Sequence, residues 1–247
     1  MTGLVLRSDS DGVATLTLNR PEALNALSPN LFVELRAHLD QIATETEGIG
    51  CVVLRGQGRS FSAGNDIKAI QAGERAPSAH FQAQTLDAIE ALPQLVIAVV
   101  HGFCYTGALE LVLACDLLVA AESARFADTH GKWAMTPTWG MSQRLPRRIG
   151  PLQAKMMMYS GTPITAARAV EIGLANLCVP DAGLDAAVAS LTATILTNSW
   201  HTLRADKRLV NEGQRYTVAD GLDYERRTSP GAGPDMAERL RSFGAKS

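Results

Sequence analysis

The chain of 247 residues is poor in charged and aromatic side chains and lacks a long apolar segment. Charged residues make up 19% and aromatic residues 5% of the sequence, against 46% hydrophobic residues. The longest apolar run, Leu95 to Val100, is far short of the roughly 20 residues that a membrane-spanning helix needs. The composition excludes a disordered chain and predicts a soluble globular protein that does not enter membranes.

The sequence also has no excess of charge of one sign. Lys and Arg total 23 and Asp and Glu total 25, so the formal net charge is −2. Without a basic excess, the chain as a whole has no electrostatic attraction to nucleic acid or to an anionic membrane surface. We therefore expect no nucleic-acid partner, although a local basic patch remains possible.

Cysteine is rare, and no metal-ligand spacing is present. The four cysteines form no CxxC pair, and the five histidines lie far apart, so we predict reduced, mostly buried thiols and no metal site. The N-terminal segment lacks the apolar stretch of a signal peptide. These features predict a cytoplasmic protein.

Common nucleotide and hydrolase motifs are absent as well. The chain has neither a GxxxxGK[ST] phosphate loop nor a GxSxG nucleophile turn. Gly56 and Gly58 follow a predicted strand, but residue 61 is Phe61, so the third glycine of a dinucleotide-binding turn is missing.

Over the first 150 residues, short apolar strands alternate with helices. Ser28 and Pro29 mark a helix start, because serine caps free N–H groups and proline fits the first turn. The patterns predict strands over 13–18, 51–54, 95–100 and 116–120, and helices from 29, over 81–92 and over 108–114. Strands that are apolar on both faces and separated by helices favour a layered α/β core.

After Gly150 the sequence becomes mostly helical. Helical patterns occupy 151–159, 165–172, 184–196, 200–212 and 216–227, with one strand candidate over 176–179. The segment 228–234 is a break before a final short helix. We predict a core over residues 1–190 and a helical C-terminal region over residues 191–247.

Two glycine-containing turns follow buried strands and carry candidate binding groups. In the first, FSAGNDI over 61–67, small residues permit close approach of a ligand, and N–H groups around Asn65 are available to donate. In the second, HGFCYTGALE over 101–110, Gly107 begins a helix whose first N–H groups lack intrahelical partners. One donor from each turn would make a hole for a developing oxyanion. An ordinary strand-to-helix turn remains the alternative for the first.

Three acidic or basic side chains are candidate catalysts. Glu110 lies three residues after Gly107, so it projects from the same end of the helix; alternatively, it is only a favourable first-turn carboxylate. Asp128 and His130 form an acid–histidine pair that is either catalytic or structural.

Several motifs in order resemble the crotonase superfamily, the enoyl-CoA hydratase and isomerase family. They extend from about residue 13 to about residue 227, and the ordered set is much more specific than any one motif. The motifs are NRPEALNAL (19–27), FSAGNDIK (61–68), VIAVVHGFCYTGALELVLACDL (96–117), FADTH (126–130), QRLPRRIG after Trp139-Gly140, and SGTPITAARAVEIGLAN (160–176).

The resemblance implies a crotonase-like ββα spiral core and a helical C-terminal trimerisation region, with trimers often paired into hexamers. It implies an acyl-CoA thioester as substrate, as in fatty acid metabolism, and requires no redox cofactor or metal. The oxyanion hole would be the N–H groups of Asn65 and Gly107. The residues expected to contact CoA or the acyl group are Ala23, Leu24, Ala63, Asp66, Ile67, Tyr105 and Trp139.

The resemblance also assigns the catalytic pair and exposes the main departure from the family. Glu110 matches the first of the two glutamates of hydratases, whereas His130 occupies the position of the second. Thr106 and Ala108 stand where the family often has glycine. We expect a hydratase acting on a trans-2-enoyl-CoA, with Glu110 activating water and His130 assisting proton transfer at the α-carbon. The alternatives are a Δ3,Δ2-enoyl-CoA isomerase or other enolate chemistry, and a non-catalytic acyl-CoA binder.

Overall fold

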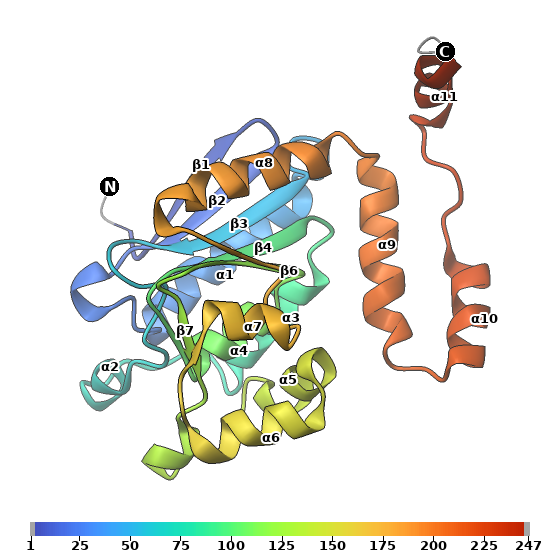
Figure 1. The fold of residues 1–247 in the computed structure, drawn as a ribbon. Coiled ribbons are helices and arrows are strands. Elements are labelled where there is room, and N and C mark those ends of the chain that lie inside the picture. The colour runs from blue at the N-terminus through green and yellow to red at the C-terminus, as the bar shows by residue number, and fades with distance from the viewer. Residues whose placement is uncertain (1–2, 245–247) are drawn as a thin grey trace.

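A computed structural model describes residues 3–244 and contains one large and one small β-sheet. The large sheet has the strand order β1-β2-β3-β4-β6-β9 (Figure 1). Only β1 and β2 are antiparallel; every later neighbour pairs in parallel. The strands are β1 (Val5–Ser10), β2 (Val13–Leu18), β3 (Cys51–Gly56), β4 (Leu95–Val100), β6 (Leu117–Ala121) and β9 (Leu177–Val179).

The small sheet joins β5 (Phe103–Tyr105), β7 (Arg125–Ala127) and β8 (Ile164–Thr165). Within it, β5 and β7 are parallel, and Tyr105 is the register partner of Ala127. Because parallel strands end at the same edge of a sheet, the segments that follow β5 and β7 leave the sheet side by side. This register brings residues 106–110 next to residues 128–130.

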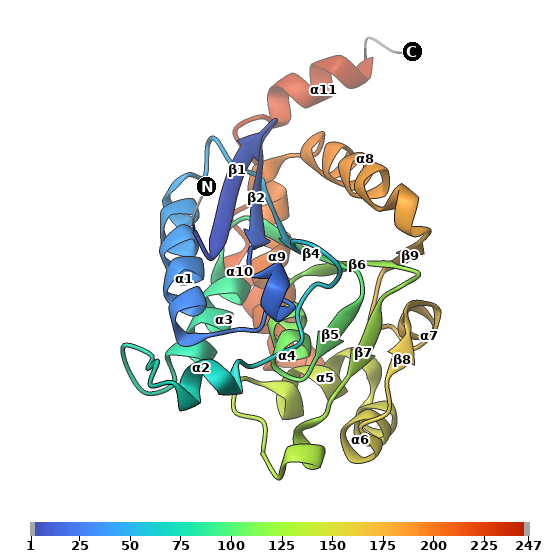
Figure 2. The same cartoon turned by 90° about the vertical axis from the view of Figure 1, so that its left-hand side faces the viewer.

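Helices fill the connections and cover both faces of the large sheet (Figures 1 and 2). Up to residue 149 they are η1 (Pro21–Ala23), α1 (Pro29–Thr44), α2 (Ile67–Gln71), α3 (Phe81–Ala91), α4 (Gly107–Leu113), η2 (His130–Trp133) and α5 (Met141–Ile149). The later ones are α6 (Pro151–Ser160), α7 (Ala166–Glu171), η3 (Asp181–Gly183), α8 (Leu184–Leu196), α9 (Trp200–Gly213), α10 (Val218–Thr228) and α11 (Met236–Gly244). Among the described residues, no helix combines the length and apolarity needed to cross a bilayer.

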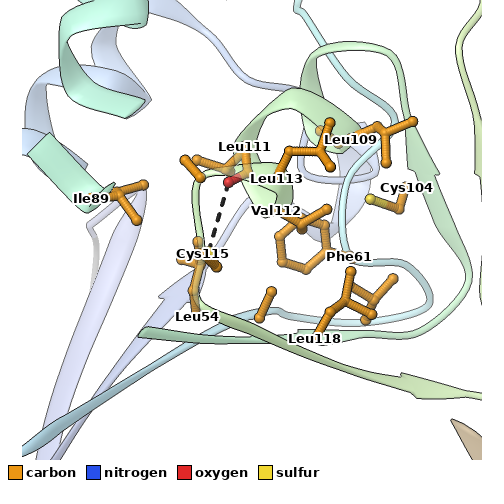
Figure 3. Packing of buried hydrophobic residues seen from close by; sticks show 14 of the residues in the cluster. Leu54, Phe61, Ile89, Cys104, Leu109, Leu111, Val112, Leu113, Cys115 and Leu118 are labelled. Atoms are coloured by element: carbon orange, nitrogen blue, oxygen red, sulfur yellow. Dashed lines mark hydrogen bonds between the residues drawn. The ribbon is translucent and has the colours of Figure 1, made fainter. Parts of the chain in front are cut away.

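The strands are apolar throughout because each face of the sheet packs against a helix. In β3, Val52 and Leu54 face one cluster together with α1 and α4, whereas Val53 faces a second cluster covered by α8. The short helix α4 is the centre of the first cluster, and all seven of its residues are buried. Figure 3 shows Phe61 and Cys104 packed against it.

The predicted α/β core and helical C-terminal region are confirmed. Strands 13–18 and 95–100 and helix 184–196 have the predicted bounds, and the Ser28 hydroxyl caps α1 by accepting from Leu31 N–H. The four cysteines are free thiols, and three are buried. The predicted division after residue 190 falls inside α8, and residues 245–247 of the predicted C-terminal region lie outside the described residues.

The sequence analysis missed β1, several short strands and the helices α2 and α5. A signal for β1 was present in Asp11-Gly12, which connects it to β2. Both residues have positive φ, 52° and 78°, as a two-residue hairpin turn requires.

One buried ion pair fastens the C-terminal helices to the core. Lys207 on α9 places its Nζ 2.8 Å from Oδ2 of Asp116, and the same ammonium donates to the Gln94 carbonyl at 2.9 Å. The Asp116 carboxylate also accepts from Val96 N–H at 2.7 Å. Beyond α9, α10 lies on its outer side and α11 projects away from the core (Figures 1 and 2).

Replacing Lys207 by Met should lower the free energy of unfolding by about 3–5 kcal/mol, because the largely buried Asp116 loses its counter-charge. Chemical denaturation at one fixed protein concentration measures this. Arg215→Met is the matched control, since the Arg215 ion pair with Glu212 is exposed and should contribute less than about 1 kcal/mol. Equally small losses in the two variants would contradict the anchoring role of Lys207.

Candidate active site

The two glycine-containing turns meet at the N-terminus of α4. A Cβ built on Gly107 would lie 3.4 Å from the backbone nitrogen of Asn65, and one built on Gly64 would lie 3.5 Å from the nitrogen of Gly107. Among the described residues, neither the Asn65 nor the Gly107 N–H has a hydrogen-bond acceptor. The structure thus places two free backbone donors together, next to the positive end of a helix.

The side chain of Asn65 adds a further unpaired group at this point. Its Oδ1 atom is buried and has no hydrogen-bond partner within the part of the chain that the structure describes. A buried amide oxygen without a partner costs free energy, so it is available to a donor on a bound ligand.

The segment after β2 runs beside the first turn and holds two of the predicted contact residues. Leu24 and Asn25 both have φ of 52°, so the chain bends sharply here. The amide side chain of Asn25 stabilises the bend by donating to the carbonyls of Gln57 and Ser60. The Leu24 carbonyl accepts from Ala63 N–H at 3.0 Å. Ala23, the last residue of η1, therefore lies on a rigid loop beside the first turn.

Asp66 has a structural role that the sequence analysis did not identify. One of its carboxylate oxygens caps α2 by accepting from Ala69 N–H at 2.9 Å, and the other lies 2.6 Å from a guanidinium nitrogen of Arg20. Burial alone would raise the pKa of Asp66, but these bonds and the Arg20 charge outweigh it and lower that pKa. The next residue, Ile67, is 40% exposed and free to contact a ligand.

Thr106 occupies a strained conformation immediately before Gly107. Its φ of 53° and ψ of −109° are values that a β-branched residue rarely adopts. Its hydroxyl lies 2.5 Å from the hydroxyl of Thr129 and accepts from Thr129 N–H at 3.1 Å. These bonds hold the turn in place and tie it to the segment that precedes His130.

Glu110 is a buried carboxylate with one oxygen fixed and one directed toward the imidazole of His130. Its Oε1 accepts from the N–H groups of Trp139 and Met141, at 2.9 and 3.0 Å. Its Oε2 lies 3.7 Å from Nε2 of His130. Burial raises the pKa of Glu110 above its usual value, and the two N–H bonds and the His130 charge offset only part of this effect.

The His130 ring lies between two carboxylates. Its Nδ1 is 2.6 Å from Oδ1 of Asp128, opposite the Nε2 atom that faces Glu110. Burial by itself lowers the pKa of His130, but the Asp128 hydrogen bond and the charges of Asp128 and Glu110 together raise it. The imidazolium form is therefore favoured beyond its ordinary pH range.

The remaining predicted contact residues border the same region. Trp139 packs edge-on against Phe32 with ring centroids 5.1 Å apart, and its ring would be 2.6 Å from a Cβ on Gly107. Tyr105 ends β5, and its carbonyl would be 2.5 Å from a Cβ on Gly64. The structure thus brings the predicted residues into one continuous region. It adds Arg20 and Thr129, whose contacts with Asp66 and Thr106 cross between distant segments and leave no local sequence motif.

Acidic and thiol groups do not gather into a metal-binding cluster within residues 3–244. This region brings together two backbone donors, the buried carboxylates of Glu110 and Asp128, and the imidazole of His130.

Gly107→Ala should lower the free energy of unfolding by about 1–3 kcal/mol and change tryptophan fluorescence, because the new Cβ would overlap the Trp139 ring. Chemical denaturation and emission spectra measure both effects. Gly131→Ala is the control, since a Cβ there meets nothing within 4 Å and should change stability by less than about 0.5 kcal/mol. A Gly107→Ala protein with wild-type stability and spectrum would contradict this packing.

Comparison with known proteins places this geometry in a family. Residues 8–231 match the family model described as enoyl-CoA hydratase/isomerase. A crotonyl-CoA hydratase from Syntrophomonas wolfei is 31% identical over 225 residues, which cover 90% of this chain and 86% of that protein. The crystal structure of an enoyl-CoA hydratase from Bacillus anthracis is 33% identical with a TM-score of 0.93, covering 99% of this chain and 97% of the other. The crystal structure of an enoyl-CoA hydratase from Mycobacterium smegmatis is 29% identical with a TM-score of 0.85, covering 97% of this chain and 97% of the other. The chain belongs to the enoyl-CoA hydratase/isomerase family, as its motifs predicted.

Proposed function

We propose that the protein is a hydratase that adds water to the double bond of a trans-2-enoyl-CoA. The observation that carries the proposal is the buried Glu110 Oε2, 3.7 Å from His130 Nε2, beside two unpaired backbone N–H groups. Hydration needs a base for water, an acid for the α-carbon and a stabiliser for the enolate oxygen. This region supplies one group for each task.

The N–H groups of Asn65 and Gly107 bind the thioester oxygen in this proposal. As water adds to the β-carbon, negative charge moves onto that oxygen, and fixed donors stabilise it without having to reorient. The closeness of the two nitrogens and their lack of protein acceptors support this role. The α4 dipole adds to the stabilisation, because its positive end is at Gly107.

Glu110 and His130 divide the proton transfers between them. Glu110 starts ionised and takes one proton from water while the water oxygen bonds to the β-carbon. The imidazolium of His130 gives its Nε2 proton to the α-carbon, which restores the thioester carbonyl. Glu110 then holds one extra proton and His130 lacks one, and transfer from Oε2 to Nε2 restores the starting state. The net reaction adds one water to the substrate.

The CoA and acyl portions are assigned to the residues around this centre. We assign CoA to the loop of Ala23 and Leu24 and to Ala63 and Ile67, with Asp66 acting by fixing the first turn. The rigid Leu24–Ala63 hydrogen bond and the exposure of Ile67 support this assignment. Tyr105 and Trp139 border the acyl group, since both lie against the glycines of the two turns.

The reaction as proposed consumes only water and the thioester, so it needs no metal or redox cofactor. Dialysis against a chelator should leave the rate of hydration unchanged. Cytoplasmic location likewise stays a prediction from the sequence, which fractionation of the source cells would test.

Loss of the conjugated-thioester absorbance of crotonyl-CoA tests the proposed function. We expect turnover by the wild type and a decrease in kcat of about 10²–10⁴-fold in Glu110→Gln and in His130→Ala, because each removes one proton-transfer group. Glu171→Gln is the matched control, since Glu171 on α7 is an exposed partner of Arg168 outside the proposed site, and it should keep its activity.

No absorbance loss, together with retained acyl-CoA binding, would contradict the hydratase. Turnover of a 3-enoyl-CoA would then identify an isomerase, and inertness toward both substrates would identify a binder. Full activity of Glu110→Gln would refute the assignment of Glu110 as the base.

We also propose that copies of the chain assemble through the C-terminal helices into a trimer or a pair of trimers. Large apolar side chains on α10 and α11 are uncovered, with Val218 83% and Phe243 82% exposed. Uncovered apolar surface on projecting helices favours association with another subunit. Native mass spectrometry should give three or six chains, and Val218→Asp with Phe243→Asp should shift the mass toward one chain. A monomeric wild type at micromolar concentration would contradict the assembly.

A further inference from the structure

Asp128 is one of the most deeply buried acids of the described residues and bonds only to the residue that follows it by two positions. The residue is 1% exposed, and its Oδ1 accepts from the backbone N–H of His130 at 3.0 Å and lies 2.6 Å from the ring Nδ1. One carboxylate oxygen thus holds both the main chain and the ring of His130. A carboxylate left inside a protein without a counter-charge is costly, so a neighbouring cation is strongly favoured.

The Asp128 bond determines which ring nitrogen faces the proposed substrate. An ionised carboxylate can only accept, so His130 Nδ1 carries a proton and donates it to Asp128. Nε2 then faces Glu110 Oε2 at 3.7 Å and is the nitrogen whose proton can come and go. Without Asp128, the ring could rotate, or place its proton on the other nitrogen.

We propose that Asp128 is a positioning residue for the hydration reaction, fixing the ring and the charge of His130 so that Nε2 is the proton donor to the α-carbon. This inference rests on the proposed function. It makes Asp128, His130 and Glu110 one unit of two carboxylates around one imidazole, in which Asp128 never contacts the substrate.

The charges around the ring give the sign of the expected pH dependence. The titratable and charged groups on the surrounding elements are Glu110 on α4, Arg125 on β7, Asp128 after β7, Lys132 on η2, Lys155 and Tyr159 on α6, and Tyr105 on β5. Both lysines are exposed and neither bonds to the ring, and burial raises the pKa of Tyr105, so that phenol stays neutral. The two carboxylates raise the pKa of His130 by more than burial lowers it. Removing the Asp128 charge must therefore lower that pKa.

The substitution Asp128→Asn removes the negative charge of Asp128 while keeping its hydrogen bonds to His130. The amide oxygen of asparagine can still accept from the His130 N–H and from Nδ1–H, so the ring keeps its support while the negative charge is lost. Asp128→Ala removes both. Asp116→Asn is the control, because Asp116 is a largely buried carboxylate that likewise accepts a backbone N–H, but it lies in the Lys207 ion pair away from His130.

The first measurement is an NMR titration of histidine-labelled protein, with the His130 signal assigned through His130→Gln. We expect the His130 pKa to fall by about one unit or more in Asp128→Asn, because an adjacent opposite charge shifts a pKa by about 1–3 units. Asp116→Asn should leave it unchanged. This readout needs no turnover, so it reports on the Asp128–His130 coupling even if the proposed function is wrong.

The second measurement is the pH profile of kcat/KM for crotonyl-CoA. In the wild type, activity falls at low pH as the Glu110–His130 pair takes up a second proton and at high pH as it loses its only one. Asp128→Asn should move the high-pH limb of the profile to lower pH, so its loss of activity should be larger on the alkaline side of the wild-type optimum than on the acidic side. Asp128→Ala should lose activity at every pH.

These measurements distinguish a failure of the positioning role of Asp128 from a failure of the proposed function. An unshifted His130 pKa in Asp128→Asn, or an activity loss that is equal at all pH values and matched by Asp116→Asn, would overturn the positioning role and leave Asp128 as a purely structural residue. A wild type that turns over neither crotonyl-CoA nor longer 2-enoyl-CoA substrates would overturn the proposed function itself, whatever the titration shows.

Discussion

The candidate site depends on keeping the Glu110 carboxylate buried. Ionising a carboxylate that is 2% exposed is costly, and the two backbone N–H groups that converge on its Oε1 offset part of this cost. They come from Trp139 and Met141, on either side of Gly140, whose φ of 118° lets the chain turn back on itself. The same turn starts α5 and places the Trp139 ring against Gly107. The acid, the helix start and the aromatic wall are thus held by one bend of the chain.

The sequence is sufficient to predict the elements that obey simple patterns. The strand 95–100 is apolar on both faces and has the bounds that its pattern predicted, and Gly107 does begin a helix. Patterns were insufficient where contacts are long-range. The three-residue strands β5 and β7 have too few residues for a periodic signal, although their register brings Thr106 beside Thr129. The Arg20–Asp66 ion pair crosses 46 positions and leaves no local trace.

The candidate site residues likewise divide into those that the sequence could identify and those whose role only the structure shows. Asn65, Gly107, Glu110 and His130 were identified because they fall on family motifs, and the geometry of the site is consistent with that choice. Asp128 was noted only as half of an acid–histidine pair, since a sequence cannot show that one oxygen holds both the N–H and the ring of His130. Nor could it show that Thr106 adopts a positive φ, a conformation tolerated because its hydroxyl is bonded to Thr129.

The histidine that departs from the family pattern changes the electrostatics of the site. Two carboxylates 3–4 Å apart in a buried region cannot both ionise, so such a pair must share a proton. An imidazole opposite Glu110 instead allows both groups to be charged, with opposite signs, and the pair still contains one transferable proton. That arrangement needs an imidazole that stays protonated despite burial. Asp128 supplies the second negative charge, so the Glu110–His130 pair is chemically complete only together with the acid two positions before the histidine.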